Sequence, residues 1–435
     1  MSNRDSSSDS GSGSSDEAET AEPTIAQDIV VTKYNMAAEI VNAVLADLAA
    51  RCIDGASVIE LCEYGDQQLI EKTGKVFKKG KEMKKGIAFP TCISINNCVC
   101  HYSPLKSESH LMKLTNGDVV KIDLGAHVDG FIATVAHTVV VGASSDNKVT
   151  GRKADVVLAA YNAVEAAIRM LRPGQHKNSD ITDTISKVCD SYDCKPIENM
   201  LSFQLKRSQI GNDDDENTKQ IIQNPSEEMR TKVKKCEFKV HEVYAIDILV
   251  SSGEGKGREM DTRTTVYKRK ENLVYQLKMK ASRIFLSEAD KRFSQMPFSL
   301  RMFDDEKKAK MGIVECERHE LMKPFKVLYE RENEYVAQFK TTVLIMSNGL
   351  LKITGMPLAE DHYRCEHVIE DKALIQLIST SLKPKSKKKP NKKASIGGDA
   401  TAETTKNQLS AATNKQQTTN VAPTTATNLT VEAVH

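Results

Sequence analysis

Two aspartates stand inside apolar segments, where a carboxylate is out of place. Asp123 lies in VVKIDLG and Asp247 lies in VYAIDIL, so each follows an Ile within a segment typical of a buried strand. A buried carboxylate is stable only when it is hydrogen-bonded, paired with a cation or bound to a metal ion. If two half-domains each bring such a strand to a common centre, the two carboxylates could contribute to a two-metal site. Asp129, at the expected turn after the first segment, is predicted to be exposed and to need no partner.

The rest of the chain alternates between helical and strand patterns. Apolar residues recur at helical spacing over 26–52, and Ser57 is placed to cap a second helix over 57–73. The charged stretch 212–235 is expected to be an exposed excursion. Further helices are expected over 152–171, 179–192, 273–293 and 306–321, a short strand and an irregular segment over 89–104, a strand over 238–255, and strand pairs over 119–142 and 334–349. This mixture predicts an α/β or α+β fold with a substantially antiparallel sheet.

The two ends of this 435-residue chain are poor in core-forming residues. Residues 1–23 are acidic and Ser-rich, and 383–435 are Lys-rich and then rich in Thr, Ala and Asn, so both are expected to be disordered tails around a folded part over 24–382. The ten cysteines show no disulfide framework and no CxxC zinc pattern. No signal peptide or long apolar run stands out, which predicts a reducing cytoplasmic or nuclear setting without membrane insertion.

Three motifs resemble the methionine aminopeptidase family, which is peptidase family M24 and has the pita-bread fold. They are FPTCISINNCVCHYSP from Phe89, VVKIDLGAHVDGFIA from Val119 and EVYAIDILVSSGEGKG from Glu242. The resemblance implies one aminopeptidase-like domain over 24–382, with a curved antiparallel sheet flanked by helices and a small insert within 256–330. It also implies a site where two Asp, one His and two Glu hold two divalent metal ions around an attacking water.

Only part of that ligand set matches this sequence. The first Asp matches Asp123, but the second falls on Thr134, eleven residues on. The His aligns with Phe203 in NMLSFQL, the first Glu with Asp247, and the second Glu with Lys340 in AQFKTT. Phe offers no lone pair, a Thr hydroxyl is neutral, and Lys340 would place an ammonium where the family has an anion. The comparison predicts a pseudo-enzyme with no catalytic residue, no metal and no other cofactor.

The same Lys supplies the partner that the two aspartates need. Without a metal ion, Asp123 and Asp247 would be left uncompensated, so Lys340 is predicted to form a buried ion pair with one or both of them.

Two histidines bear on this interpretation. The family's substrate-contacting His matches His101, which could still contact a peptide N-terminus or could be a remnant of the fold. His241 would take the ligand position if the alignment at Phe203 were shifted. In that case Thr134 and Lys340 would still argue against metal binding.

A longer match points to one branch of this family. The segments MPFSLRMFDDEKKAKMGIVECERHELMKPF, from Met296, and SSGEGKGRE, from Ser251, resemble the catalytically inactive, proliferation-associated branch, also called the ErbB-receptor-binding group. That resemblance implies an RNA-binding protein of the cytoplasm, nucleus and nucleolus that regulates translation, ribosome biogenesis, rRNA processing, transcription and cell proliferation. The implied partners are ribosomal and other structured RNA, the large ribosomal subunit, transcription regulators and receptor cytoplasmic tails.

Clusters of basic residues fit a nucleic-acid partner. Seven of the eleven residues in KPKSKKKPNKK, from Lys383, are Lys, a pattern that also fits a nuclear localisation signal. Aromatic residues do not interleave with these clusters, so contacts with the RNA backbone and shape are expected rather than base stacking. The candidate phosphate-binding residues are Lys78, Lys79, Lys81, Lys84, Lys85, Lys256, Arg258, Lys268, Arg269, Lys383, Lys385, Lys387, Lys388, Lys389, Lys392 and Lys393.

Two other functions stay open at this point. An active methionine-type metalloaminopeptidase with altered ligands would need His101, Asp123 and Asp247 to suffice, and metal content and peptidase activity would reveal it. A transcription co-regulator that acts by protein contacts alone would show little salt-sensitive affinity for RNA. The apolar stretch ALIQLI, from Ala373, is expected either to offer a short helix to a partner or to pack on the fold.

Overall fold

A computed structural model describes most of the predicted folded part. The described residues are 23–78, 83–108, 112–211, 218–270 and 273–383. They belong to one compact unit, and 386–435 form a second unit that lies outside the described residues, as does most of the predicted tail over 1–23.

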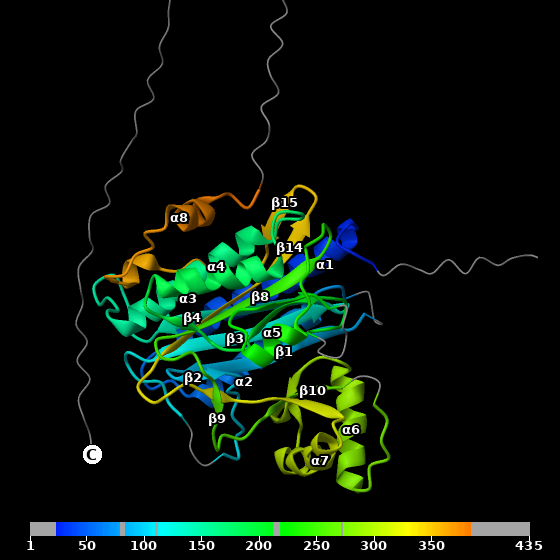
Figure 1. The fold of residues 1–435 in the computed structure, drawn as a ribbon. Coiled ribbons are helices and arrows are strands. Elements are labelled where there is room, and N and C mark those ends of the chain that lie inside the picture. Colours follow the sequence, from blue (N-terminus) through cyan, green and yellow to red (C-terminus); the bar gives the residue numbers. More distant parts are fainter. Residues whose placement is uncertain (1–22, 79–82, 109–111, 212–217, 271–272, 384–435) are drawn as a thin grey trace, which may run out of the picture. The chain divides into compact units, whose positions relative to one another are not determined.

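Nine strands of the described chain form one antiparallel sheet (Figure 1). They are β1 (Lys85–Ile95), β3 (Val119–Val128), β4 (Phe131–Val140), β5 (Lys195–Pro196), β6 (Leu201–Leu205), β7 (Gln220–Ile222), β8 (Val243–Ser251), β14 (Val336–Met346) and β15 (Gly349–Lys352). The order is β1-β3-β4-β14-β8-β6-β7, with β15 beside β14 and β5 beside β8. The predicted α/β class with an antiparallel sheet is confirmed.

Two pairs of long helices pack on this sheet (Figure 1). The main helices are α1 (Asp28–Arg51), α2 (Val58–Lys75), α3 (Arg152–Met170) and α4 (Asn178–Asp190), and the short ones are α5 (Glu227–Lys232) and α8 (Lys372–Ser379). Helices α1 and α2 contact β1, β3 and β4, whereas α3 contacts β8 and β14 and α4 packs on α3 and β7. Helix α8 packs on α3, with Leu374 buried in the same cluster, so the stretch from Ala373 packs on the fold.

Strand alternation decides which side chains point at these helices. On β3, Ile122 belongs to the buried cluster that contains the apolar faces of α1 and α2. On β8, Ile246 belongs to the cluster that contains the apolar faces of α3 and α4. The residues next to them, Asp123 and Asp247, therefore point to the opposite face of the sheet. The helices cover one face, and both strand aspartates lie on the other.

Helix α1 is long and apolar enough to cross a membrane by length and composition alone, and it is the one described helix of which this is true. Its apolar side chains are used inside the fold, because Val41, Val44, Leu45 and Leu48 are fully buried against β3 and β4. This burial is that of a core helix.

The stretch expected to hold an insert contains two smaller three-stranded sheets and two helices. Their elements are β9 (Arg258–Glu259), β10 (Val266–Arg269), α6 (Lys280–Phe293), β11 (Phe298–Ser299), the 3-10 turn η1 (Leu300–Met302), α7 (Glu306–Arg318), β12 (Met322–Phe325) and β13 (Leu328–Tyr329). Strands β11-β10-β12 form one sheet, and β13 joins β9 to β2 (Cys98–Cys100) in the other. Phe285, Phe298 and Phe303 are buried between α6, α7 and β11, which gives this part an aromatic core of its own.

Several predicted boundaries were wrong for identifiable reasons. The stretch 334–349 contains one long strand, β14, buried on both faces, and its partner β15 begins at Gly349, after the Ser347–Asn348 turn. The helix predicted from 273 begins at Lys280. The carboxylate of Glu315 accepts hydrogen bonds from the backbone N–H groups of Lys278 and Met279, at 2.7 and 3.0 Å, and so caps the helix at that point.

Other expectations failed because tertiary contacts were invisible in the sequence. The stretch 212–235 is not simply exposed, since Ile221 and Ile222 in β7 are buried and pair with β6. The short strand expected in 89–104 begins earlier, at Lys85. Ser57 does occupy the N-cap position of α2, although its side chain makes no capping hydrogen bond.

Asp129 has two cationic partners, contrary to expectation. It and Gly130 form the turn between β3 and β4 with φ values of 56° and 78°, the left-handed region that a two-residue hairpin turn requires. Lys33 Nζ lies 2.6 Å from one carboxylate oxygen and Arg207 Nη2 lies 2.7 Å from the other. Burial opposes ionisation, but these two cations hold the pKa of Asp129 below its usual value. The turn is thereby tied to α1 and to the end of β6.

A second buried ion pair joins α2 to η1. Arg301 Nη2 lies 2.5 Å from Asp66 Oδ2, and both side chains are buried. Arg301 Nη1 also donates to Ser103 Oγ and to the Pro104 carbonyl, each at 3.0 Å, and Asp66 Oδ1 accepts the backbone N–H of Thr91 at 2.8 Å. Nearly every polar atom of the pair is therefore used within the protein.

We expect Arg301→Met to lower the free energy of unfolding by about 3–5 kcal/mol, because it leaves Asp66 as a buried, unpaired carboxylate. Urea denaturation at neutral pH measures the change. As a control, Lys75→Met removes the exposed pair with Glu71 and is expected to leave the midpoint nearly unchanged. Equal losses in the two variants would contradict the importance of the buried pair.

Candidate functional site

Four side-by-side strands place the two aspartates and Lys340 in one row. In the registers of neighbouring strands, Asp123 on β3 lies opposite Ala136 on β4, Ala136 opposite Lys340 on β14, and Lys340 opposite Asp247 on β8. Directly opposite residues point to the same face of a sheet. The small side chain of Ala136 leaves the space over β4 open, so the long Lys340 side chain reaches across it to Asp123.

Lys340 forms a buried ion pair with both aspartates, as the sequence predicted. Its Nζ lies 2.6 Å from Asp123 Oδ2 and 2.9 Å from Asp247 Oδ2. The side chains are only 8%, 4% and 13% exposed for Lys340, Asp123 and Asp247 respectively. The ammonium also lies 5.2 Å from the ring centroid of Phe89, within the range of a cation–π contact. We call Asp123, Asp247 and Lys340 the central triad.

Gln338 adds hydrogen bonds to the central triad, and the sequence motifs did not point to it. Its Nε2 donates to Asp247 Oδ1 at 2.9 Å and approaches Asp123 Oδ2 at 3.5 Å. The signal that could have found it is its position two residues before Lys340 on the same strand, and therefore on the same face. Its amide partly offsets the charge of the second carboxylate.

The charges of the central triad do not cancel, since one ammonium faces two carboxylates. Burial raises the pKa of Asp123 to about 6, although Lys340 acts in the other direction. Burial alone would lower the pKa of Lys340, but the two carboxylates hold it above its usual value, so the amine stays charged. Within the described residues, Asp123 Oδ1 has no hydrogen-bond partner. The triad is thus a fixed ammonium with one carboxylate that is easily protonated.

Thr134 and Phe203 lie on the same face as the triad but contribute no anion to it. Thr134 lies opposite Gly125, two residues along β3 from Asp123, and its Oγ1 is buried with no hydrogen-bond partner among the described residues. Phe203 on β6 lies opposite Ala245 and packs into an apolar cluster. As a metal ligand, Thr134 therefore offers only a neutral hydroxyl, and Phe203 offers no ligand atom.

His101 lies beside the central triad, and one hydrogen bond fixes its tautomer. Its backbone has a φ of 65°, and its Nδ1 lies 3.0 Å from the Lys326 carbonyl oxygen, so the proton is on Nδ1 and Nε2 is an acceptor. The ring packs against Phe89 and Phe325 at centroid distances of 5.9 and 5.3 Å. Burial lowers the pKa of His101 to about 4, so the ring is neutral at physiological pH.

His241 does not replace Phe203 at the centre. Its backbone N–H donates to the Ile345 carbonyl at 2.8 Å. Ile345 lies five residues from Lys340 along the regular strand β14, which is about 17 Å at the usual rise. His241 therefore lies at the end of the sheet, well away from the central triad.

The structure divides the candidate phosphate-binding residues into available and engaged groups. Lys268 is buried, and its Nζ donates to the carbonyls of Ile210 and Gly211 at 2.9 and 2.7 Å, so its inclusion was wrong. Arg269 is mostly buried and bonds Asp290. Arg258 is exposed, but its guanidinium is paired with Glu254 and Glu330. Lys78, Lys84, Lys256 and Lys383 are exposed, Lys85 is half-buried, and Lys79, Lys81, Lys385, Lys387, Lys388, Lys389, Lys392 and Lys393 lie outside the described residues.

The chain is similar to a set of proteins that share one family. Residues 32–231 match the model of metallopeptidase family M24, a span that includes Asp123, Thr134 and Phe203. Over 380 residues the chain is 43% identical to proliferation-associated protein A of Dictyostelium discoideum, covering 87% of this chain and 95% of that protein. It is also 43% identical to ERBB-3 binding protein 1 of Arabidopsis thaliana, covering 90% of this chain and 96% of that one.

Two further matches extend this picture. The curved DNA-binding protein of Schizosaccharomyces pombe is 39% identical, with 84% of this chain and 93% of that protein covered. A solved structure of a thermophilic Arx1 superposes with a TM-score of 0.76 at 31% identity, over 82% of this chain and 99% of that one. The family model and this superposition together support the predicted pita-bread architecture.

We expect Lys340→Met to lower the free energy of unfolding by about 3–5 kcal/mol at pH 7.5, because two buried carboxylates lose their cation. The deficit relative to wild type should shrink as the pH falls to 5. Like charges raise carboxyl pKa values in the folded state, so the folded variant binds protons that the unfolded chain does not and gains stability on acidification. Adding Asp123→Asn to Lys340→Met should recover part of the loss. Urea denaturation at both pH values measures these changes.

A suitable control is Lys352→Met, since its partner Glu165 keeps a second cation, Arg169, in contact. This variant should lose less stability, and its deficit should not shrink at pH 5. A deficit in Lys340→Met that stays constant between the two pH values would contradict the charge pairing.

Proposed function

Because this chain belongs to the group of proliferation-associated and ERBB-3 binding proteins within metallopeptidase family M24, we propose that it is a non-catalytic member whose metal site has become an ion pair. The observation that carries the proposal is the Lys340 ammonium, 2.6 and 2.9 Å from the two strand aspartates. It is the cation that these carboxylates bind.

The donor chemistry around the triad does not fit two divalent metal ions. Two such ions need several anionic oxygen ligands, and those ligand atoms must be free to bind them. Here Asp123 and Asp247 already accept from Lys340 and Gln338, Thr134 offers a neutral hydroxyl, and no lone pair comes from Phe203. A divalent ion a few ångströms from a fixed ammonium would meet a repulsion on the order of several kcal/mol at an effective dielectric of about 20.

Without the metal ions, the site has no metal-activated water to attack a peptide bond. Neutral His101 keeps an acceptor nitrogen, Nε2, beside the cluster, and that atom can orient a bound amine or hydroxyl. The central triad stabilises the sheet and provides no activated water. We therefore assign the central triad a structural role and His101 a role in binding.

In place of catalysis, we propose that the protein binds ribosomal and other structured RNA. One relative at 39% identity is named a curved DNA-binding protein, which supports a nucleic-acid partner for this chain. The exposed side chains Lys78, Lys84 and Lys256, together with the Lys-rich segment from Lys383, supply the positive charge. Regulation of translation, ribosome assembly, transcription and cell growth, in cytoplasm and nucleus, follows as part of the same proposal.

We expect the wild-type chain to show no hydrolysis of peptides that begin with Met, with manganese or cobalt added, and no manganese bound at the central triad. A variant that restores the ligands, Thr134→Asp, Phe203→His, Asp247→Glu and Lys340→Glu together, should gain manganese affinity. Electron paramagnetic resonance of manganese and a peptidase assay measure both outcomes. Two manganese ions bound per wild-type chain, with activity lost in Asp123→Asn, would overturn the proposal.

We expect affinity for a structured RNA to fall steeply with salt, because phosphate contacts release counterions. Changing the seven Lys residues of KPKSKKKPNKK to Gln should reduce the slope of log K against log salt by up to about 5–6, at roughly 0.7–0.9 per lost contact. The matched control changes the same residues to Arg and should keep the slope. Fluorescence anisotropy from 50 to 300 mM salt measures it, and a salt-insensitive or absent affinity would favour action through protein contacts instead.

A further inference from the structure

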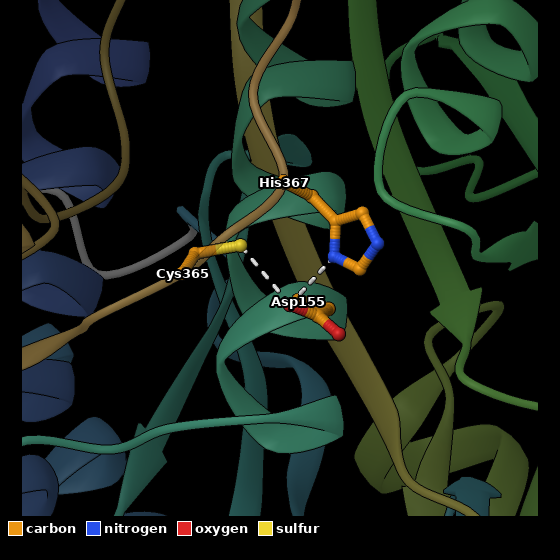
Figure 2. Close-up of side chains that lie close together, drawn as sticks. All are labelled: Asp155, Cys365 and His367. Atoms are coloured by element: carbon orange, nitrogen blue, oxygen red, sulfur yellow. Dashed lines mark hydrogen bonds and ion pairs between the residues drawn. The ribbon is translucent and has the colours of Figure 1, made fainter.

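A second cluster of ligand-type side chains lies on the helix-covered side of the fold. Asp155, from α3, faces Cys365 and His367, from the segment before α8, and Figure 2 shows both side chains directed at the aspartate. Asp155 Oδ1 lies 3.0 Å from Cys365 Sγ and 3.2 Å from His367 Nδ1. One ligand atom from each of the three residues lies within 4.8 Å of the other two.

The local backbone explains how these residues meet. Cys365 and His367 are two residues apart, with a bend at Glu366 between them, and both side chains are directed at Asp155. The segment is fixed on the fold by a bridge between Val149 and Tyr363 and by the Arg364 N–H, which donates to the Val149 carbonyl at 2.9 Å. The sequence gives no CxxC or other familiar zinc spacing here, because the third residue lies about 210 positions earlier.

The carboxylate itself is held in place from the other side. Asp155 is buried in the first turn of α3, and Arg152 Nη1 lies 3.1 Å from its Oδ2. The other oxygen, Oδ1, receives both the thiol and the imidazole. Oδ1 is thus a single oriented acceptor on which two proton donors converge.

The distances among the ligand atoms approach those of a metal site. With zinc–ligand bonds of about 2.0–2.3 Å and tetrahedral angles, neighbouring O, N and S ligands lie roughly 3.3–3.6 Å apart. The two oxygen-centred separations here, 3.0 and 3.2 Å, differ from that by only a few tenths of an ångström. In contrast to the central triad, no ammonium lies between the ligands, because Arg152 bonds the far oxygen.

We propose that Asp155, Cys365 and His367 bind one divalent transition-metal ion of the zinc class. The ligand atoms are Asp155 Oδ1, Cys365 Sγ and His367 Nδ1, a mixed O, S and N set that suits zinc. The fourth position is open to solvent, since His367 is 43% exposed. Arg152 orients the aspartate as an outer partner.

Protons balance in a simple way on binding. The thiol of Cys365 loses its proton to solvent and becomes the thiolate ligand, while neutral His367 carries its proton on Nε2 instead of Nδ1. The proton that the thiol releases couples metal binding to pH. Affinity should therefore increase with pH.

The bound metal would cross-link the segment before α8 to helix α3. The hydrogen bonds of the metal-free cluster do this weakly, because one thiol and one exposed imidazole share a single oxygen. Metal ligation would replace them with three bonds that cross between distant parts of the chain.

The full-length, reduced chain should bind one cobalt ion with a thiolate-to-cobalt absorption band, and zinc should displace the cobalt and abolish the band. Cys365→Ser should remove the band and weaken zinc binding at least about 100-fold, and Asp155→Asn and His367→Gln should each weaken it about 10–100-fold. Added zinc should raise the melting temperature of wild type and leave Cys365→Ser unshifted. The matched controls are Cys236→Ser, the other partly exposed thiol, and His362→Gln, which should both behave as wild type.

Two results would overturn the proposal. One is the absence of any thiolate band in wild type at cobalt concentrations well above that of the protein, which would leave a hydrogen-bonded cluster without metal affinity. The other is a band that persists in Cys365→Ser or is lost in Cys236→Ser, which would place the metal elsewhere on the chain. Circular dichroism of each variant without metal establishes that it is folded.

Discussion

A buried carboxylate must have a partner, and two of them in one row of the sheet need a cation between them. Lys340 meets that requirement from β14, between the strands that carry Asp123 and Asp247. A slip of one residue in β14 would turn the ammonium to the helix-covered face and leave both carboxylates without a cation, so the ion pair favours the observed register. The central triad thus joins β3, β14 and β8.

The same constraint explains how a peptidase-type scaffold can take on another role. Helices α1 to α4 bury one face of the sheet in apolar contacts, and the other face carries the triad, Gln338 and neutral His101. Lys340 supplies an internal cation for the two carboxylates on this face. A second cluster, on α3 and the C-terminal segment, offers a different ligand chemistry, with a thiol and an imidazole.

Much of this could be read from the sequence, and the failures have a common cause. The strands, the main helices and the Lys340 pairing followed from apolar patterns and from the need to balance charge. Gln338 was missed because an amide in a strand has no charge to account for, and its role appears only when the register is known. Asp129, Lys268 and Asp155 were likewise misjudged or overlooked, since their partners lie between about 60 and 210 residues away in the chain. Sequence patterns report local periodicity well, but not which distant loop supplies a carbonyl, a guanidinium or a thiol.

The most direct test of the central claim is a crystal structure of the protein grown with manganese, with anomalous diffraction recorded where manganese scatters strongly. We expect continuous density for the Lys340 side chain, its amine between Asp123 and Asp247, and no anomalous peak at that position. An anomalous peak held by both aspartates, with Lys340 turned away from them, would contradict it and would restore the protein to the metal-dependent members of its family.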